Sequence, residues 1–141
     1  MDAAERKEIL SRYVNHSRRF DEVAANPNHA TPHGADLSGG FVVMPLEGEM
    51  GQISIGPAGA AWSNVEDMAR YLITELNRGI SPDGTQVVSA ENLEETWQPQ
   101  VSISADVSYG LGWIVESYKG LKVIEHDGVT FGFTTDLVFL P

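Results

Sequence analysis

Three short apolar segments follow one another near the end of the chain, and they constrain its fold more than any other feature. They cover residues 109–117, 121–127 and 134–140. The stretch "YKG" joins the first two segments, and "GVTFG" joins the second to the third. Strand-like segments separated by so few residues pair with their neighbours as antiparallel hairpins. The pattern therefore predicts an antiparallel meander of three or more strands.

Two helices are expected before these strands. In residues 63–78 the apolar residues recur at the spacing of one helix face. Ser63 and Glu66 form a capping box at the start of this helix, and Gly79 ends it. A shorter helix, capped by its first residue, is expected over residues 89–98. Helices that pack on an antiparallel sheet define the α+β class.

The apolar face of the longer helix is predicted to be its core face. Its members are Val65, Met68, Ala69, Leu72, Ile73 and Leu76. We expect Leu72 and Leu76 to be buried against the strands that carry Trp113, Val115 and Val123. Such a face is typical of a packed core rather than of a cofactor site.

The order of elements indicates one partial domain over residues 1–141. A weak apolar stripe predicts a short helix over residues 2–14. Residues 26–60 are rich in Gly, Pro, Asn and His, and they are expected to form a long loop region. A sheet of three strands keeps two open edges, so the meander is expected to belong to a larger sheet.

Composition narrows the classes of partner. Acidic residues outnumber basic ones 20 to 9, for a formal net charge of −11, which argues against nucleic acid and anionic membrane surfaces. The chain has no cysteine, which rules out disulfides and a cysteine nucleophile. No apolar run approaches the ~18 residues that a membrane span needs. The charged start of the chain lacks the apolar stretch of a signal peptide, and the sequence assigns no compartment.

The common catalytic motifs identify few candidate site residues in this chain. Neither G-x-S-x-G nor S-x-x-K occurs in the chain, and no phosphate loop or His-Glu-x-x-His zinc motif is present. Tyr13-Val14-Asn15 has the spacing of a Y-x-N motif but lies in the charged helix, which favours a chance match. His29 and His33 flank a proline in a loop, so a metal-dependent hydrolase built on them and His126 is a remote alternative. No cofactor or metal is predicted.

Three segments together resemble the later part of serine hydrolases of the β-lactamase and penicillin-binding-protein type, including esterases and D-aminopeptidases. They are "PAGAAWSNVEDMARYL", "YGLGW" and the hairpin "HDGVTFGF", and they occur in the family's order. The resemblance implies an α+β domain in which an antiparallel sheet packs with helices. It also implies acyl-transfer hydrolysis of β-lactam, ester or D-amino-acid peptide substrates.

His126-Asp127-Gly128 matches the family's third motif in its His-x-Gly form. By the resemblance, His126 orients the substrate or the base tyrosine, and Gly128 lets the substrate lie against the strand. The backbone N–H of Val129 is then one oxyanion donor. Asp127 and Phe131 are predicted to contact the substrate. The His-x-Gly form favours an esterase or a peptidase over a dedicated β-lactamase.

The S-x-x-K nucleophile and the family's closing elements are missing from the match. One interpretation is a C-terminal-side fragment of a serine hydrolase, inactive alone because no acyl-enzyme can form without the serine. The alternative is a non-enzymatic α+β interaction module that associates through exposed sheet edges. The strands "GWIVES" and "LVFL" are then the exposed ones. Expected partners are a small-molecule acyl substrate for the completed site, and a second copy or a complementary fragment.

Overall fold

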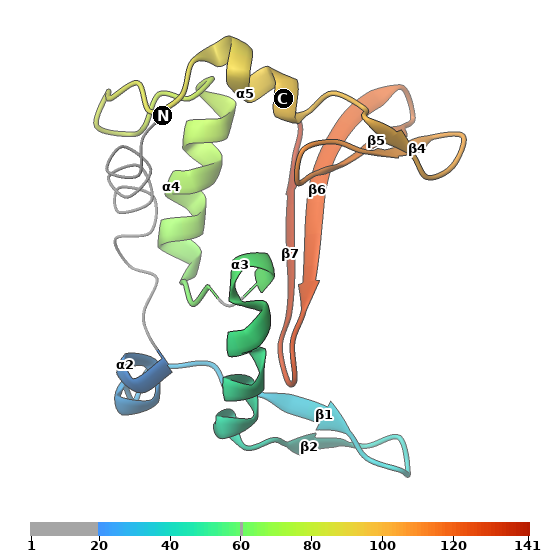
Figure 1. The fold of residues 1–141 in the computed structure, drawn as a ribbon. Helices are drawn as coiled ribbons and strands as arrows, with labels where there is room; N and C mark the ends of the chain where they lie inside the picture. Colours follow the sequence, from blue (N-terminus) through green and yellow to red (C-terminus); the bar gives the residue numbers. More distant parts are fainter. Residues whose placement is uncertain (1–19, 60) are drawn as a thin grey trace. The chain divides into compact units, whose positions relative to one another are not determined.

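The structure is a computed structural model, and it describes residues 20–59 and 61–141. Helices and antiparallel sheets make up this part of the chain, as the α+β prediction requires (Figure 1). The helices are α2 (Phe20–Ala25), the 3-10 helix η1 (Leu46–Ile55), α3 (Gly56–Gly59), α4 (Val65–Leu76) and α5 (Ala90–Thr96). The strands are β1 (His33–Ala35), β2 (Phe41–Val43), β3 (Val101–Ser102), β4 (Val107–Tyr109), β5 (Ile114–Tyr118), β6 (Leu121–Val129) and β7 (Thr134–Phe139). The helix expected over residues 2–14 lies outside the described residues.

Strands β3 to β7 form one sheet in chain order, which confirms the predicted meander. Between β5 and β6 the register pairs Tyr118 with Leu121. Lys119 and Gly120 form the turn with φ values of 53° and 80°. Two successive residues with positive φ give the tight turn whose twist matches that of the flanking strands. This turn fixes which residues of β5 and β6 face each other.

The single strand expected over residues 109–117 is wrong, because the chain breaks there into β4 and β5. Gly110 donates its backbone N–H to the carbonyl oxygen of Trp113 over 2.7 Å, and Gly112 has a φ of 92°. Gly110 also lies against the end of α5, where a Cβ atom would come within 2.5 Å of the Thr96 carbonyl oxygen. The two glycines therefore permit a tight reversal inside "YGLGW".

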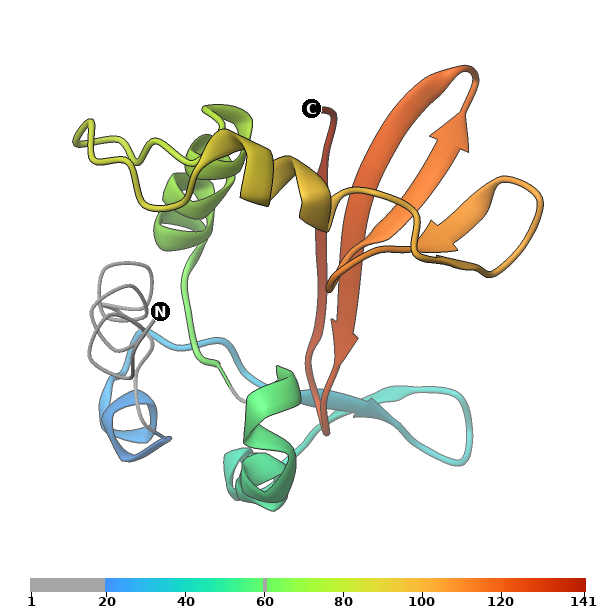
Figure 2. The same ribbon diagram turned by 45° about the horizontal axis from the view of Figure 1, so that its top comes forward.

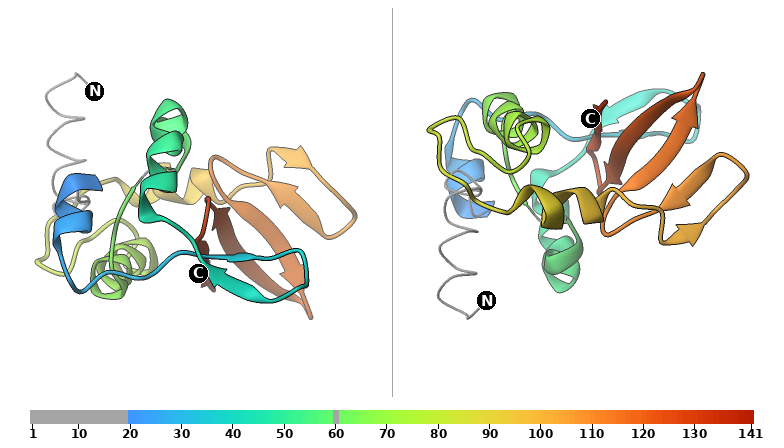
Figure 3. Two further views of the ribbon diagram at one scale, coloured as in Figure 1. Left: turned by 90° about the horizontal axis from the view of Figure 1, so that it is seen from below. Right: turned by 90° about the horizontal axis from the view of Figure 1, so that it is seen from above.

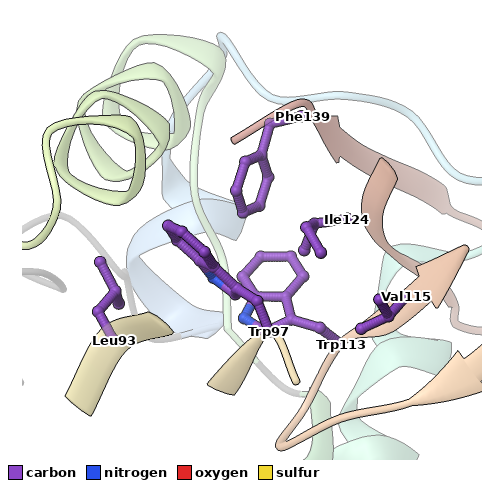
Figure 4. Packing of buried hydrophobic residues seen from close by; sticks show 6 residues of the cluster. All are labelled: Leu93, Trp97, Trp113, Val115, Ile124 and Phe139. Atoms are coloured by element: carbon purple, nitrogen blue, oxygen red, sulfur yellow. The ribbon is translucent and has the colours of Figure 1, made fainter. Parts of the chain in front are cut away.

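The described residues divide into two compact units. The first contains residues 64–126 and 136–141, and the second contains residues 20–59, 61–63 and 127–135. In the first unit, α4 and α5 precede the strands (Figure 2). Its core joins α5 to the sheet through side chains that point toward one another (Figure 4). They are Leu93, Trp97, Trp113, Val115, Ile124 and Phe139.

Aromatic rings form the centre of this core. Phe139 meets Trp97 and Trp113 edge to face, with centroid distances of 5.5 and 5.2 Å. The ring of Tyr71, on α4, stacks on Trp113 at 6.3 Å. Edge-to-face pairs stabilise beyond the burial of their area because a ring edge is positive and a ring face is negative. The aromatic cluster thus links both helices to the sheet.

Helix α4 does not bury the face that its apolar spacing predicts. Leu72 is partly buried against the core, as expected, but Leu76 is 50% exposed and Val65 is 82% exposed. Thr74 and Glu75 are buried instead. The apolar arc is wider than the part of it that packs in the first unit. Its exposed edge consists of Val65, Ala69, Ile73 and Leu76, called here the α4 stripe.

The buried Glu75 carboxylate finds a partner on α5. The indole Nε1 of Trp97 donates to Glu75 Oε2 over 3.2 Å. Burial raises the pKa of the Glu75 carboxyl, and hydrogen bonds from Tyr71 and Trp97 offset part of that rise. A hydrogen-bonded carboxyl group is tolerated inside a core where an unpaired one is not. This bond joins α4 to α5.

The capping residue predicted from the sequence is the observed one at α5 but not at α4. Ser89 caps α5, with its hydroxyl accepting from the N–H of Asn92 over 3.3 Å, as predicted. At α4 the cap is Asn64, one residue later than the predicted Ser63. Its side chain accepts from the N–H of Asp67 over 3.0 Å and donates to the Asp67 carboxylate over 2.7 Å. Asn64 thus takes the role expected of Ser63, whereas Asp67 accepts from the cap side chain and not from its backbone N–H.

Residues 26–60 are not the continuous loop that the sequence predicts. β1 and β2 form a hairpin (Figure 3), followed by η1 and α3. Their register places Gly34 opposite Val42. The turn is built by Asp36, whose Oδ1 accepts from the N–H groups of Ser38 and Gly40 over 2.8 and 2.7 Å. Strands of three residues are too short to show an alternating pattern, so the sequence does not reveal them.

Candidate active site

His126 lies on β6 in the first unit, and its side chain is exposed. Its ring atom Nε2 lies 3.3 Å from the hydroxyl oxygen of Tyr109, within hydrogen-bonding distance. The two rings meet edge to face, with centroids 6.3 Å apart and planes at 67°. A phenol and an imidazole can each donate and accept a hydrogen bond. The two side chains can therefore form a hydrogen bond with either one as the donor.

Sheet register brings Tyr109 to this position. Tyr109 pairs with Ile114 across β4 and β5, and Ile114 pairs with Glu125 across β5 and β6. Tyr109 thus lies two strands away from the residue before His126. Sequence reasoning missed this contact because it kept residues 109–117 in one strand. Counting back from the tight β5–β6 turn, with a second reversal at the "YGLGW" glycines, is the signal that could have found it.

Gly128 and Val129 end β6 in the second unit. At Gly128 a Cβ atom would lie 2.8 Å from the hydroxyl oxygen of Thr135, on β7. The missing side chain thus makes room for a neighbour across the hairpin, a role that the sequence did not indicate. Val129 is 72% exposed at the last position of the strand. Its role as oxyanion donor stays a prediction.

Asp127 and Phe131 also belong to the second unit. The Asp127 side chain is exposed on β6, and Phe131 is 47% exposed in the turn that follows. The covered side of the Phe131 ring lies against Gly48 of η1, where a Cβ atom would be 2.4 Å from the ring. Asp127, Gly128, Val129 and Phe131 are thus brought together around one strand end, and their contact with substrate stays a prediction.

The turn after this strand end is held by residues that the sequence did not single out. Glu49 is 6% exposed, and its Oε1 accepts from the N–H of Gly132 over 2.9 Å. The carbonyl oxygen of Gly132 accepts from the N–H of His33 over 2.9 Å, and Thr130 donates to the carbonyl oxygen of Phe133. Glu49 and Gly132 are 83 residues apart, so no local pattern connects them.

The described part of the chain offers no metal site for a hydrolase built on His29, His33 and His126. The Nδ1 atoms of His29 and His33 each contact a nearby backbone carbonyl oxygen, over 2.9 and 2.8 Å. Within residues 20–59 and 61–141, no three His, Cys, Asp or Glu side chains are grouped so that they could hold a metal ion. In the same residues no helix combines the length and the apolar character of a membrane span.

Comparisons with known proteins agree with the fold and place the chain in a family. The Beta-lactamase family profile matches residues 4–141. The unguisins hydrolase ungD' of Aspergillus campestris is 32% identical over 106 residues, which are 72% of this chain and 19% of the relative. Penicillin-binding protein 4 of Amycolatopsis lactamdurans is 31% identical over 94 residues, which are 62% of this chain and 24% of the relative.

A solved structure shares the architecture. The octameric penicillin-binding protein homologue from Pyrococcus abyssi superimposes with a TM-score of 0.76 at 23% identity, covering 96% of this chain and 30% of that one. The chain belongs to the beta-lactamase family, and its fold is that of penicillin-binding-protein homologues. It spans 19 to 30% of the length of the relatives that it matches.

Proposed function

We propose that this chain carries the third-motif side of a β-lactamase-related serine hydrolase and needs a nucleophile-bearing segment to act. The observation that carries the proposal is the exposed His126 on β6, with the Tyr109 hydroxyl 3.3 Å from its ring, in a domain of this family. No S-x-x-K sequence occurs in residues 1–141. The relatives extend far beyond the matched region, which leaves room for such a segment in a complete hydrolase.

The proposed reaction is acyl transfer. A serine of the completing segment attacks the substrate carbonyl, the leaving group departs with a proton, and water then cleaves the acyl-enzyme ester. His126 orients the substrate or the base that takes the serine proton, and Tyr109 lies close enough to exchange a proton with it. The N–H of Val129 donates to the oxyanion, and Asp127 and Phe131 contact the rest of the substrate.

We place the substrate among short esters and D-amino-acid peptides, ahead of β-lactams. His126 supplies an imidazole where family members of the Lys-Thr-Gly form have an ammonium group. An imidazole can accept a proton near neutral pH, whereas an ammonium group acts as a fixed positive charge. The names of the relatives, a hydrolase and a penicillin-binding protein, are compatible with this choice.

The test is hydrolysis of p-nitrophenyl acetate and nitrocefin by the purified 141-residue chain. We expect no rate above background, because removing the nucleophile of a serine hydrolase costs orders of magnitude in rate. Covalent labelling of any serine by a fluorophosphonate or a penicillin probe would contradict the proposal. An in-frame S-x-x-K in the coding sequence just upstream of Met1 would support it, and its absence there would favour a non-enzymatic role.

A second proposal is an α+β interaction module, and the α4 stripe is the observation that favours it. Exposed apolar residues at helical spacing are typical of a face that packs against a partner. The sequence placed the exposed surface on "GWIVES" and "LVFL" instead. That choice is wrong for Trp113, Val115 and Phe139, which are buried at 7, 6 and 5% exposure.

We propose that the α4 stripe mediates assembly with a second copy or with a complementary fragment. The octameric state named for the Pyrococcus abyssi homologue supports self-assembly in this family. Sedimentation velocity at micromolar concentration should show a species larger than 15.3 kDa, and Ile73→Glu should reduce it. Glu66→Lys, on the polar side of the same helix, is the control. A compact monomer that Ile73→Glu leaves unchanged would exclude a second copy and leave the complementary fragment as the partner.

A further inference from the structure

A buried carboxylate reaches the turn that follows the His126-Asp127-Gly128 segment. Glu49 lies on η1 and is 6% exposed, and its Oε1 accepts from the backbone N–H of Gly132 over 2.9 Å. Burying a carboxylate is costly unless hydrogen bonds compensate for the lost water. A bond from an N–H group to a charged oxygen is about twice as strong as a neutral one. Glu49 therefore anchors this peptide more firmly than a neutral side chain would.

The same glycine is held on its other side by β1. Its carbonyl oxygen accepts from the N–H of His33 over 2.9 Å. A Cβ atom at Gly132 would lie 2.3 Å from the Cβ of Pro32, a separation that only glycine avoids. Figure 1 shows the tip of the β6–β7 hairpin beside β1. Gly132 is thus clamped between Glu49 and the Pro32–His33 backbone.

The neighbouring residues of the turn depend on this clamp. Thr130 donates its N–H to the carbonyl oxygen of Phe133 over 2.9 Å, which closes the turn. The Phe131 ring packs against the backbone of Gly48, the residue before Glu49. Val129 immediately precedes the turn and is otherwise 72% exposed. It is the last residue of β6 and leads directly into this turn, so a displaced turn would move its backbone N–H.

We infer that Glu49 is a positioning residue, which holds the 130–133 turn so that the Val129 N–H and the Phe131 ring keep a fixed orientation. The inference rests on the proposed function, because it assigns Glu49 to the support of the same strand end. It adds a residue outside the third motif, contributed by a different part of the chain. Loss of the carboxylate releases Gly132, and the strand end then samples several orientations.

The test compares the isotope-labelled 141-residue chain with Glu49→Ala and Glu49→Gln by nuclear magnetic resonance. Glu47→Ala is the matched control, because Glu47 is exposed on the same helix. Glu49→Ala should speed amide exchange at Gly132 by about tenfold or more, given the typical strength of a hydrogen bond to a charged group. It should also shift the amide resonance of Val129. Glu49→Gln keeps an acceptor oxygen but no charge, so both signals should lie between those of wild type and Glu49→Ala.

Ile124 provides the internal reference, because it is fully buried in the core of the first unit. The inference fails if Glu49→Ala leaves Val129 unchanged, or if Ile124 and Val129 lose protection equally, since that pattern means general destabilisation. If Glu49→Ala does not fold, Glu49→Asp replaces it, because the shorter side chain withdraws the carboxylate from Gly132. Failure here would leave the hydrolase proposal standing, because no step of this experiment measures hydrolysis.

Discussion

Replacing Phe139 with alanine should destabilise the first unit more than a change at any exposed position of the same strand. Phe139 is 5% exposed, and its ring meets Trp97 and Trp113 edge to face at 5.5 and 5.2 Å. Replacing a buried phenylalanine with alanine lowers the free energy of unfolding by about 3–5 kcal/mol. Each aromatic pair adds about 0.5–1.5 kcal/mol beyond burial, so we expect the upper half of that range. The total free energy of unfolding of a native protein is only about 5–15 kcal/mol.

The measurement is urea unfolding followed by tryptophan fluorescence. Trp62 belongs to the second unit, so every variant also carries Trp62→Phe, and the signal then comes from Trp97 and Trp113 alone. Val138→Ala is the control on the same strand, because Val138 is 43% exposed, and it should cost less than about 1 kcal/mol. If the Phe139 and Val138 variants lose equal stability, the end of β7 frays and the aromatic cluster does not hold the sheet.

Three further outcomes follow from the first unit. Leu72→Ala should lower the free energy of unfolding more than Leu76→Ala, because Leu72 packs against the core and Leu76 is half exposed. We expect the loss at Leu76 to be about 1 kcal/mol or less. If urea unfolding ranks the two variants the other way, the observed burial of α4 is contradicted. Burial raises the pKa of Glu75 in the folded chain above its ordinary value of about 4.5, so its contribution to stability is complete below that value and is lost as the pH rises through the raised one. Glu75→Gln should therefore gain stability relative to wild type as the pH rises above about 4.5, and a constant difference over pH-dependent melts would refute this. Gly110→Ala should cost about 1–3 kcal/mol or more, because its new Cβ would meet a backbone carbonyl oxygen, and thermal unfolding is the measurement.

Much of the fold follows from local patterns in the sequence. The Lys119–Gly120 turn appears as a hairpin signal because glycine tolerates positive φ where other residues resist it. Ser89 caps α5 as its residue type predicts. The meander order follows from short connections, which leave each strand no neighbour but the next one. These features depend on residues close together in the chain.

Side-chain burial on α4 was not predictable in the same way. The apolar spacing marks an arc of the helix, but it does not say which part of that arc the rest of the chain covers. The sheet and α5 approach the side of Tyr71, Leu72 and Glu75, which leaves the α4 stripe exposed. The ionisable Glu75 is thus buried although Leu76 was expected to be, and the Trp97 indole donates a hydrogen bond to its carboxyl group.

The candidate site shows the same division. His126-Asp127-Gly128 is recognisable in the sequence because three adjacent residues carry the motif. Tyr109 and Glu49 are not recognisable there, because their partners are 17 and 83 residues away. Sheet register decides the first contact, and the packing of η1 against the hairpin turn decides the second. The sequence by itself determined the chemical groups of the strand end, whereas the tertiary structure alone decided their supports, because hydrogen bonds between distant segments depend on how the chain folds back on itself.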